Sequence, residues 1–86
     1  PNTQKNQMEP IVVELPQGGI SFPSGPHNGE EFGYVIAGTV TLVTDTASYI
    51  VHRGETFYLD GKSSHYLRND KKTTAQVLWV STPPLF

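Results

Sequence analysis

Two histidines and a glutamate are placed along this sequence so that they could serve metal or ligand chemistry. His27 and Glu31 lie four residues apart in the stretch HNGEEFGYVIAGTV, and His65 follows a later turn. Because alternate side chains of a β-strand point to the same face, an extended segment would aim His27 and Glu31 at one point. Two imidazoles and one carboxylate suit an octahedral iron, manganese, nickel or zinc ion with open positions. Spacing alone does not separate this triplet from the others that three histidines and eight acidic residues allow.

The elements that must position these residues are strands. Eight glycines and seven prolines interrupt the sequence every few positions, and no helical apolar periodicity survives. Short β-branched and aromatic runs alternate with turn sequences such as DTAS, HRGE and NDKKT, a pattern typical of an all-β sandwich or barrel. The predicted strands are Ile11–Leu15, Ile20–Phe22, Glu31–Ala37, Thr39–Thr44, Tyr49–Arg53, Thr56–Leu59, His65–Arg68 and Ala75–Ser81.

Length and composition limit the classes of protein to which the chain could belong. Its 86 residues suffice for one domain, and a net charge of −2 with six scattered Lys and Arg leaves no basic stripe for nucleic acid. The chain has no cysteine, and no run approaches the ~20 apolar residues of a membrane span, so we expect no membrane partner. The polar, aperiodic start predicts a linker or disordered segment over residues 1–9, as part of a longer protein, before one folded domain over residues 10–86.

The spacing of glycines, histidines and acidic residues resembles the two sequence motifs of the cupin superfamily. The positions that keep the motif spacing are Gly19, His27, Glu31, Gly38, Gly54, His65 and Asn69. This resemblance implies the cupin double-stranded β-helix, an all-β jelly-roll barrel. It also implies that His27, Glu31 and His65 occupy metal-ligand positions, whereas Gly25 stands where a further histidine ligand is usual.

A narrower resemblance indicates gene regulation. The stretches HNGEEFGYVIAGTVTL and GETFYLDGKSSHYLRN and the tail VLWVSTPPLF are similar to the C-terminal cupin sensor of bacterial lambda-repressor-type regulators. The resemblance implies a cytoplasmic sensor domain that binds a small-molecule effector in its barrel, directly or through a divalent transition metal (Fe, Mn, Ni or Zn). It also implies that DNA is contacted only through an upstream helix-turn-helix domain that is absent from this chain.

Strand alternation places Phe32, Tyr34 and Ile36 on the face opposite Glu31. If Glu31 faces the barrel interior, these apolar side chains need a cover, either the strand at Ile11–Leu15 or a second subunit. A thin-cored barrel with strands that are apolar on both faces is more easily satisfied as a homodimer, which we therefore expect.

Two aromatic residues complete the predicted site. Tyr58 and Trp79 could line a ligand mouth beside His27, Glu31 and His65, because small-molecule pockets combine apolar walls with a few placed polar groups. Ordinary core packing is the alternative for both aromatics, and the sequence does not decide between them.

Two further functions stay open at the level of the sequence. A small metal-dependent cupin enzyme, such as a dioxygenase or an isomerase, would use the same two histidines and carboxylate around a bound metal. A structural barrel that only dimerises would need neither metal nor pocket. The sensor is the reading we favour, because Gly25 removes one customary ligand, and no catalytic residue is assigned.

Overall fold

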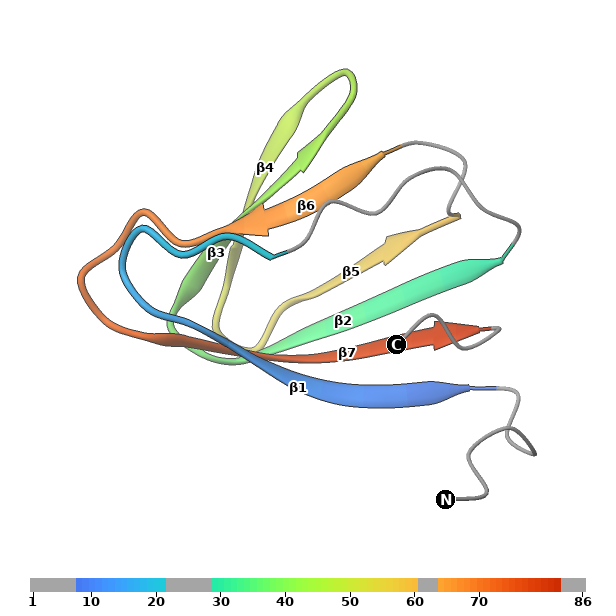
Figure 1. Ribbon diagram of the computed structural model, residues 1–86, viewed down its shortest axis with the longest axis horizontal. Coiled ribbons are helices and arrows are strands. Elements are labelled where there is room, and N and C mark those ends of the chain that lie inside the picture. The colour runs from blue at the N-terminus through green and yellow to red at the C-terminus, as the bar shows by residue number, and fades with distance from the viewer. Residues whose placement is uncertain (1–7, 22–28, 61–63, 83–86) are drawn as a thin grey trace.

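The computed structural model describes residues 8–21, 29–60 and 64–82, which form seven β-strands and no helix (Figure 1). The strands are β1 (Glu9–Leu15), β2 (Glu30–Ala37), β3 (Thr39–Thr44), β4 (Ser48–His52), β5 (Thr56–Leu59), β6 (His65–Arg68) and β7 (Ala75–Thr82). Seven of the eight predicted strands are confirmed, with ends that shift by two residues at most. The strand predicted at Ile20–Phe22 is instead a single bridge from Ile20 to Arg68, and Phe22 lies outside the described residues.

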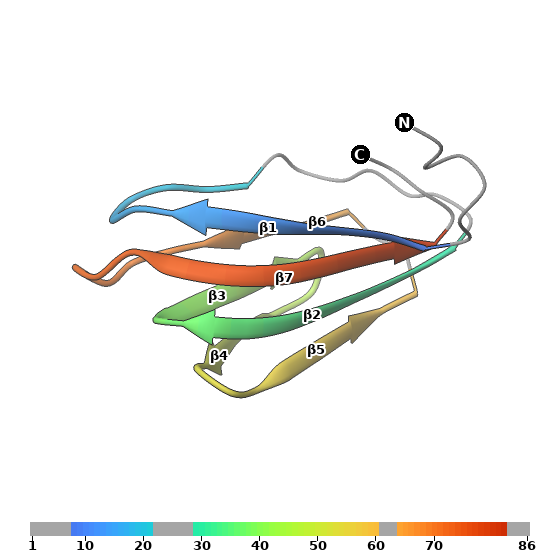
Figure 2. The same cartoon turned by 90° about the horizontal axis from the view of Figure 1, so that it is seen from below.

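The strands form two antiparallel sheets that lie face to face (Figures 1 and 2). One sheet has the order β1-β7-β2-β5, which Figure 2 shows side by side, and the other has the order β4-β3-β6. Strands that are distant in sequence therefore become neighbours, as where β2 pairs with β7. This arrangement confirms the all-β architecture that the short, regularly spaced strands predict.

The core lies between the two sheets and follows the alternation of side chains along each strand. In β2 and β7 every second residue is buried, as expected for strands with one face on the core. The buried apolar side chains form one cluster: Leu15, Val35, Val40, Leu42, Val51, Phe57, Leu67, Ala75, Val77 and Trp79.

A glycine in the middle of β2 makes room for the ring of Phe57, which packs against Trp79. Gly33 pairs with Phe57 of β5 on one side and with Trp79 of β7 on the other. The two rings meet edge to face above it, with centroids 5.9 Å apart. A Cβ atom on Gly33 would lie 2.1 Å from Cζ of Phe57. No larger residue fits at this position without moving the ring.

The outer face of the four-stranded sheet is apolar and uncovered by the described residues. Its exposed apolar side chains are Val12, Phe32, Tyr34, Ile36 and Tyr58. The alternation predicted for β2 is confirmed, but the first strand does not cover this face. Strand β1 pairs edge to edge with β7 and so belongs to the same sheet, where its own Val12 is exposed. The sequence analysis expected either the strand at Ile11–Leu15 or a second subunit to cover the outer face of β2. The structure excludes the strand at Ile11–Leu15.

The ends of the domain agree with the sequence only where they are described. The linker expected over residues 1–9 falls mostly on residues 1–7, outside the described residues, and β1 already begins at Glu9. Within residues 8–21, 29–60 and 64–82, no helix is long and apolar enough to cross a membrane.

Candidate functional site

The first inward-facing residue of β2 is a carboxylate buried between the sheets. Glu31 is 1% exposed and lies opposite Ser81 of β7 and Leu59 of β5. An ionised carboxylate in an apolar core is strongly unfavourable unless hydrogen-bond donors surround it. The neighbours of Glu31 therefore decide what this position can do.

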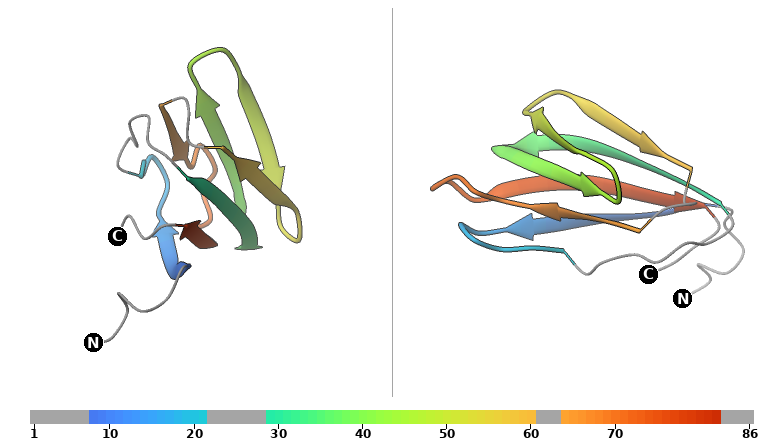
Figure 3. Two further views of the ribbon diagram at one scale, coloured as in Figure 1. Left: turned by 90° about the vertical axis from the view of Figure 1, so that its right-hand side faces the viewer. Right: turned by 90° about the horizontal axis from the view of Figure 1, so that it is seen from above.

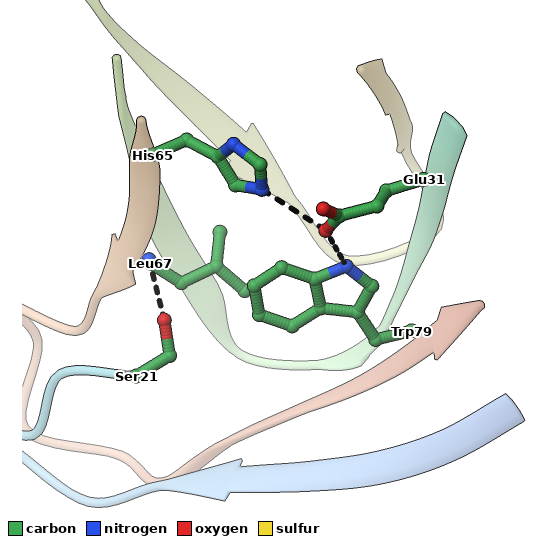
Figure 4. Close-up of polar contacts among 5 residues, drawn as sticks. All are labelled: Ser21, Glu31, His65, Leu67 and Trp79. Carbon is green, nitrogen blue, oxygen red and sulfur yellow. Dashed lines mark hydrogen bonds and ion pairs between the residues drawn. The ribbon is translucent and has the colours of Figure 1, made fainter. Parts of the chain in front are cut away.

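Donors from both sheets reach the same oxygen of Glu31 (Figure 4). The indole Nε1–H of Trp79, on the adjacent strand β7, donates to Oε1 over 2.7 Å. Nε2 of His65, the first residue of β6 in the opposite sheet, lies 2.9 Å from Oε1. His65 and Trp79 are themselves buried, with ring centroids 6.2 Å apart. We call Glu31, His65 and Trp79 the internal cluster.

The chemistry of the three groups sets the direction of these bonds. An indole nitrogen only donates, and an ionised carboxylate only accepts, so His65 donates from Nε2 while Glu31 is ionised. Such charge-assisted bonds are short and strong compared with bonds between neutral groups. Because His65 comes from one sheet and Glu31 and Trp79 from the other, the internal cluster ties the two sheets together.

The internal cluster fits a divalent transition metal in donor type but not in number. A carboxylate oxygen and an imidazole nitrogen are ligands that such ions accept. Within the described ranges, however, no three His, Cys, Asp or Glu side chains gather around one point. The two candidate donors also bond to each other, at 2.9 Å. A metal site would need a further donor, and the predicted one, His27, lies outside the described residues.

Tyr58 does not join the internal cluster. It lies opposite Phe32 on the outer face of the sheet and is 62% exposed. A hydrogen bond to the carboxylate of Glu30 raises the pKa of the Tyr58 hydroxyl above its ordinary value of 10.0. Of the predicted site residues, the structure brings together Glu31, His65 and Trp79, and it places Tyr58 on the other side of the same sheet.

Asn69 has a structural role that motif spacing did not reveal. Its side chain is fully buried, and Nδ2 donates to the carbonyl oxygens of Leu15 and Thr73 at 2.8 and 2.9 Å. Its Oδ1 accepts a hydrogen bond from the backbone N–H of Lys71 at 2.9 Å. Asn69 thus joins the end of β1 to the turn between β6 and β7. A buried, fully bonded asparagine beside a turn is typical of a fold-determining residue.

Sequence reasoning identified Trp79 but not its contact. Its place beside Glu31 depends on the register of β7 against β2, in which Trp79 faces Gly33. A lone tryptophan on a closing strand does not indicate that register, because strands so distant in sequence pair through the tertiary fold. Gly33 is a signal that could have indicated one close contact in this region, since a glycine inside a strand marks the approach of a bulky neighbour, here Phe57.

Comparisons with known proteins agree with this geometry. The family model described as "Cupin domain" matches residues 11–81. An uncharacterized protein of Methanocaldococcus jannaschii is 25% identical over 85 residues, covering 98% of this chain and 68% of that protein.

Two solved structures are also similar. A predicted oxalate decarboxylase of Thermotoga maritima superposes with a TM-score of 0.85 at 18% identity, covering 96% of this chain and 73% of that one. The cupin domain of an XRE family transcriptional regulator from Enterobacter cloacae has a TM-score of 0.81 at 20% identity, covering 92% of this chain and 84% of that one. At these identities the likeness concerns the fold.

Proposed function

Because this chain belongs to the cupin domain family, we propose that it is the effector-sensing and dimerising cupin domain of a transcriptional regulator. In this proposal it acts in the cytoplasm, and an upstream helix-turn-helix domain of the same protein contacts DNA. The structural likeness to the cupin domain of an XRE family regulator supports the choice of a regulator. The six scattered Lys and Arg support the assignment of DNA binding to another domain.

One observation carries the proposal: the buried carboxylate of Glu31 is held by donors from both sheets, His65 and Trp79. A small polar metabolite that bonds to Glu31 or His65 must compete with the contact between them. Its binding would therefore change how firmly β6 is tied to β2. A ligand shifts a conformational equilibrium by its difference in affinity for the two states, and such a contact supplies one.

Strand β2 connects this event to the proposed dimer interface. Glu31 points inward and the next residue, Phe32, points outward among the apolar side chains of the outer face. A second copy placed against that face would cover Phe32, Tyr34 and Ile36. Movement of β2 on ligand binding would then alter the dimer and the spacing of its two DNA-binding domains.

A metal is the second route by which this domain could hold its effector. His27, Glu31 and His65 would be the ligands, and a bound divalent ion would offer a positive charge to an anionic effector. Elemental mass spectrometry on tag-free protein, with His65→Ala as control, tests this route. Stoichiometric metal that is lost in the variant supports it, and metal-free protein that still binds an effector excludes it.

Effector binding is tested by thermal shift with separate sets of carboxylates, polyamines and sugars. We expect one set to raise the melting temperature of the native chain and to have a much smaller effect on Glu31→Gln, which keeps the side-chain volume. Lys72→Gln, on the exposed turn before β7, is the matched control and should respond like the native chain. An equal shift in Glu31→Gln would show that the internal cluster is not the effector site.

The dimer is tested separately by sedimentation equilibrium. Tyr34→Glu places a charge in the centre of the outer face and should weaken the dimer about tenfold or more. Thr46→Glu, in the exposed turn between β3 and β4, should leave the dimer unchanged. A monomeric native chain at all concentrations would contradict this part of the proposal.

A metal-dependent enzyme, such as a dioxygenase or an isomerase, is the second candidate. It is favoured by one observation, the 2.9 Å distance between a carboxylate oxygen and an imidazole nitrogen in a protected interior. The similarity in fold to a predicted oxalate decarboxylase supports it as well. Turnover of a small acid by metal-loaded protein, lost in His65→Ala, would favour this candidate over the sensor.

A further inference from the structure

A second concave surface lies on the side of the molecule away from β1. It is a groove of about 760 Å³ whose walls come mainly from β4 and β5. Figure 3 shows the course of these two strands and of the turn at residues 53–55 that joins them. The walls of the groove include Tyr49, Glu55, Thr56, Phe57, Tyr58 and Leu59. We call it the β4/β5 groove. None of the residues of the internal cluster lines it.

Each sheet of this sandwich has two edge strands, and the four edge strands differ in how well they are protected against pairing with a further strand. Strand β1 carries Glu9, Pro10 and Glu14, and proline and charge are the usual means of preventing further strand pairing. The edge of β6 is covered by the segment before residue 22, through backbone bonds between Ser21 and Leu67 and between Gly19 and Asn69. Strand β4 reads SYIVH and strand β5 reads TFYL, with neither proline nor a carboxylate, lysine or arginine. The two unguarded edges are the ones that border the β4/β5 groove.

The backbone of β5 offers free hydrogen-bonding groups at this edge. The N–H of Val35 donates to the carbonyl of Glu55 at 3.0 Å, which sets the phase of the antiparallel pairing. Hydrogen-bonded and non-hydrogen-bonded residue pairs alternate along an antiparallel ladder, so the pairs that Thr56 and Tyr58 form with β2 are non-hydrogen-bonded. The N–H and C=O groups of Thr56 and Tyr58 therefore point away from β2. Among the described residues, no strand pairs with that side of β5.

Tyr49 is an inward-facing aromatic side chain that the described residues leave uncovered. It lies opposite Leu42 in the β3–β4 pairing and therefore points to the same, inner face as Leu42. Leu42 is buried, whereas Tyr49 is 54% exposed. An inward-facing aromatic side chain stays this exposed only because nothing among the described residues lies over the β4/β5 groove.

From these observations we propose that the β4/β5 groove binds an extended peptide of a partner protein, which adds as a strand to the free edge of β5. The inward side chains of that strand would rest on Phe57, Leu59 and Tyr49, and its backbone would bond to Thr56 and Tyr58. Strand addition of this kind gains affinity from main-chain bonds and specificity from alternate side chains. The proposal does not depend on the sensor function.

The chemistry of the groove defines the partner. Its one ionisable carboxylate is that of Glu55, whose Oε1 also accepts a bond from the N–H of His52 at 2.8 Å. The peptide should therefore be apolar at alternate positions and basic at the end that meets Glu55. A concave groove does not complement itself, which argues against a second copy of this surface. Nor do the ends of this chain fit, because PNTQKNQ has no apolar side chain besides proline and PPLF has two prolines.

The test uses a defined probe, the blocked heptapeptide Lys-Val-Thr-Val-Thr-Val-Thr, titrated into the full ¹⁵N-labelled chain and followed by NMR. We expect chemical-shift changes confined to residues 42–44 and 48–59, the segments that line the β4/β5 groove. Thr56→Pro removes an outward N–H and should weaken binding about tenfold, and Tyr49→Ser, which leaves the backbone intact, about fivefold. Val12→Pro, two residues from Pro10 on the guarded edge, is the matched control and should bind like the native chain.

Three outcomes would overturn the proposal. One is the absence of binding up to about 1 mM peptide, or shifts outside residues 42–44 and 48–59. Another is equal binding of a peptide with N-methyl groups on alternate amides, which would indicate a site for small apolar groups. The last is a change in these resonances with protein concentration alone, which would indicate a second copy of this chain.

Discussion

The two faces of β2 reverse the usual distribution of polar and apolar side chains. Its inner face begins with the buried carboxylate of Glu31, and its outer face presents Phe32, Tyr34 and Ile36, which are 38–40% exposed. The buried carboxyl group of Glu31 is hydrogen-bonded within the chain to His65 and Trp79. The outer apolar groups find no cover among the described residues. One strand thus carries a buried polar centre and an exposed apolar surface, and both are costly unless they bind something.

The comparison predicts that substitutions on the inner face destabilise the isolated chain, while those on the outer face mainly affect association. On the inner face, removal of the Glu31 side chain takes away the oxygen to which two buried groups bond. On the outer face, removal of a side chain should change the free energy of unfolding of one subunit only a little.

The largest difference is expected between neighbours on β2. Glu31→Ala should lower the free energy of unfolding by about 3–5 kcal/mol, because it removes the buried oxygen that both Nε2 of His65 and the indole N–H of Trp79 contact. Phe32→Thr should lower it by only about 1 kcal/mol, because threonine keeps the strand propensity and Phe32 is partly exposed. Urea unfolding followed by circular dichroism measures both. Equal losses would remove the distinction between the two faces.

A second test concerns the glycine of the inner face. Gly33→Ala should destabilise the chain by about 2–3 kcal/mol, because the new Cβ would overlap the ring of Phe57, 2.1 Å away. The double variant Gly33→Ala/Phe57→Leu should recover part of this loss, since the smaller side chain can move aside. Additive losses in the double variant would show that the ring contact is not the cause.

Trp79→Phe isolates the hydrogen bond from the packing. Phenylalanine keeps an aromatic ring against Phe57 but cannot donate to Glu31, so the loss should be about 1–2 kcal/mol. Guanidinium unfolding by circular dichroism gives this value. A variant as stable as the native chain would mean that the indole N–H does not help to hold the buried carboxylate.

The smallest effect belongs to the outer face. Glu30→Gln removes the carboxylate that accepts the Tyr58 hydrogen bond, so the pKa of Tyr58 should fall towards 10.0. Because the pKa of Tyr58 is higher in the folded chain than in the unfolded chain, the Glu30–Tyr58 contact adds to the free energy of unfolding at pH values below the unfolded-state pKa. This stabilisation is lost as the pH rises through the folded-state pKa. The variant should lack this pH dependence. Titration of ¹³C-labelled tyrosine by NMR follows Tyr58 separately, and an unchanged pKa would exclude Glu30 as the cause.

Local patterns explain why most strands could be predicted. Alternating β-branched and aromatic residues between turn sequences depend on neighbours in sequence, and the ends of β3, β5 and β6 agree with the prediction to the residue. The segment at Ile20 differs because it makes only one bridge, to Arg68. A short apolar run in the sequence does not show how many of its residues will pair with a neighbouring strand.

The contact between Glu31 and His65 could be predicted from motif spacing, whereas the places of the other candidate residues could not. Glu31 and His65 were identified from spacing and are in contact, whereas His27 lies outside the described residues. Tyr58 is aromatic and near the motif, but the pairing of β5 turns Phe57 inward against Gly33 and Tyr58 outward. A strand of four residues with apolar groups on both faces does not indicate which face is buried.

The sequence by itself determined the all-β class, most of the strands and the placement of Glu31 on the face opposite Phe32, because these depend on alternation over a few residues. Only the tertiary structure decided that Trp79 donates to Glu31, that β1 extends the sheet instead of covering it, and that β4 and β5 border a groove. These features depend on the register and order of strands far apart in the chain. Such pairings are fixed by the packing of the two sheets together, which no local pattern encodes.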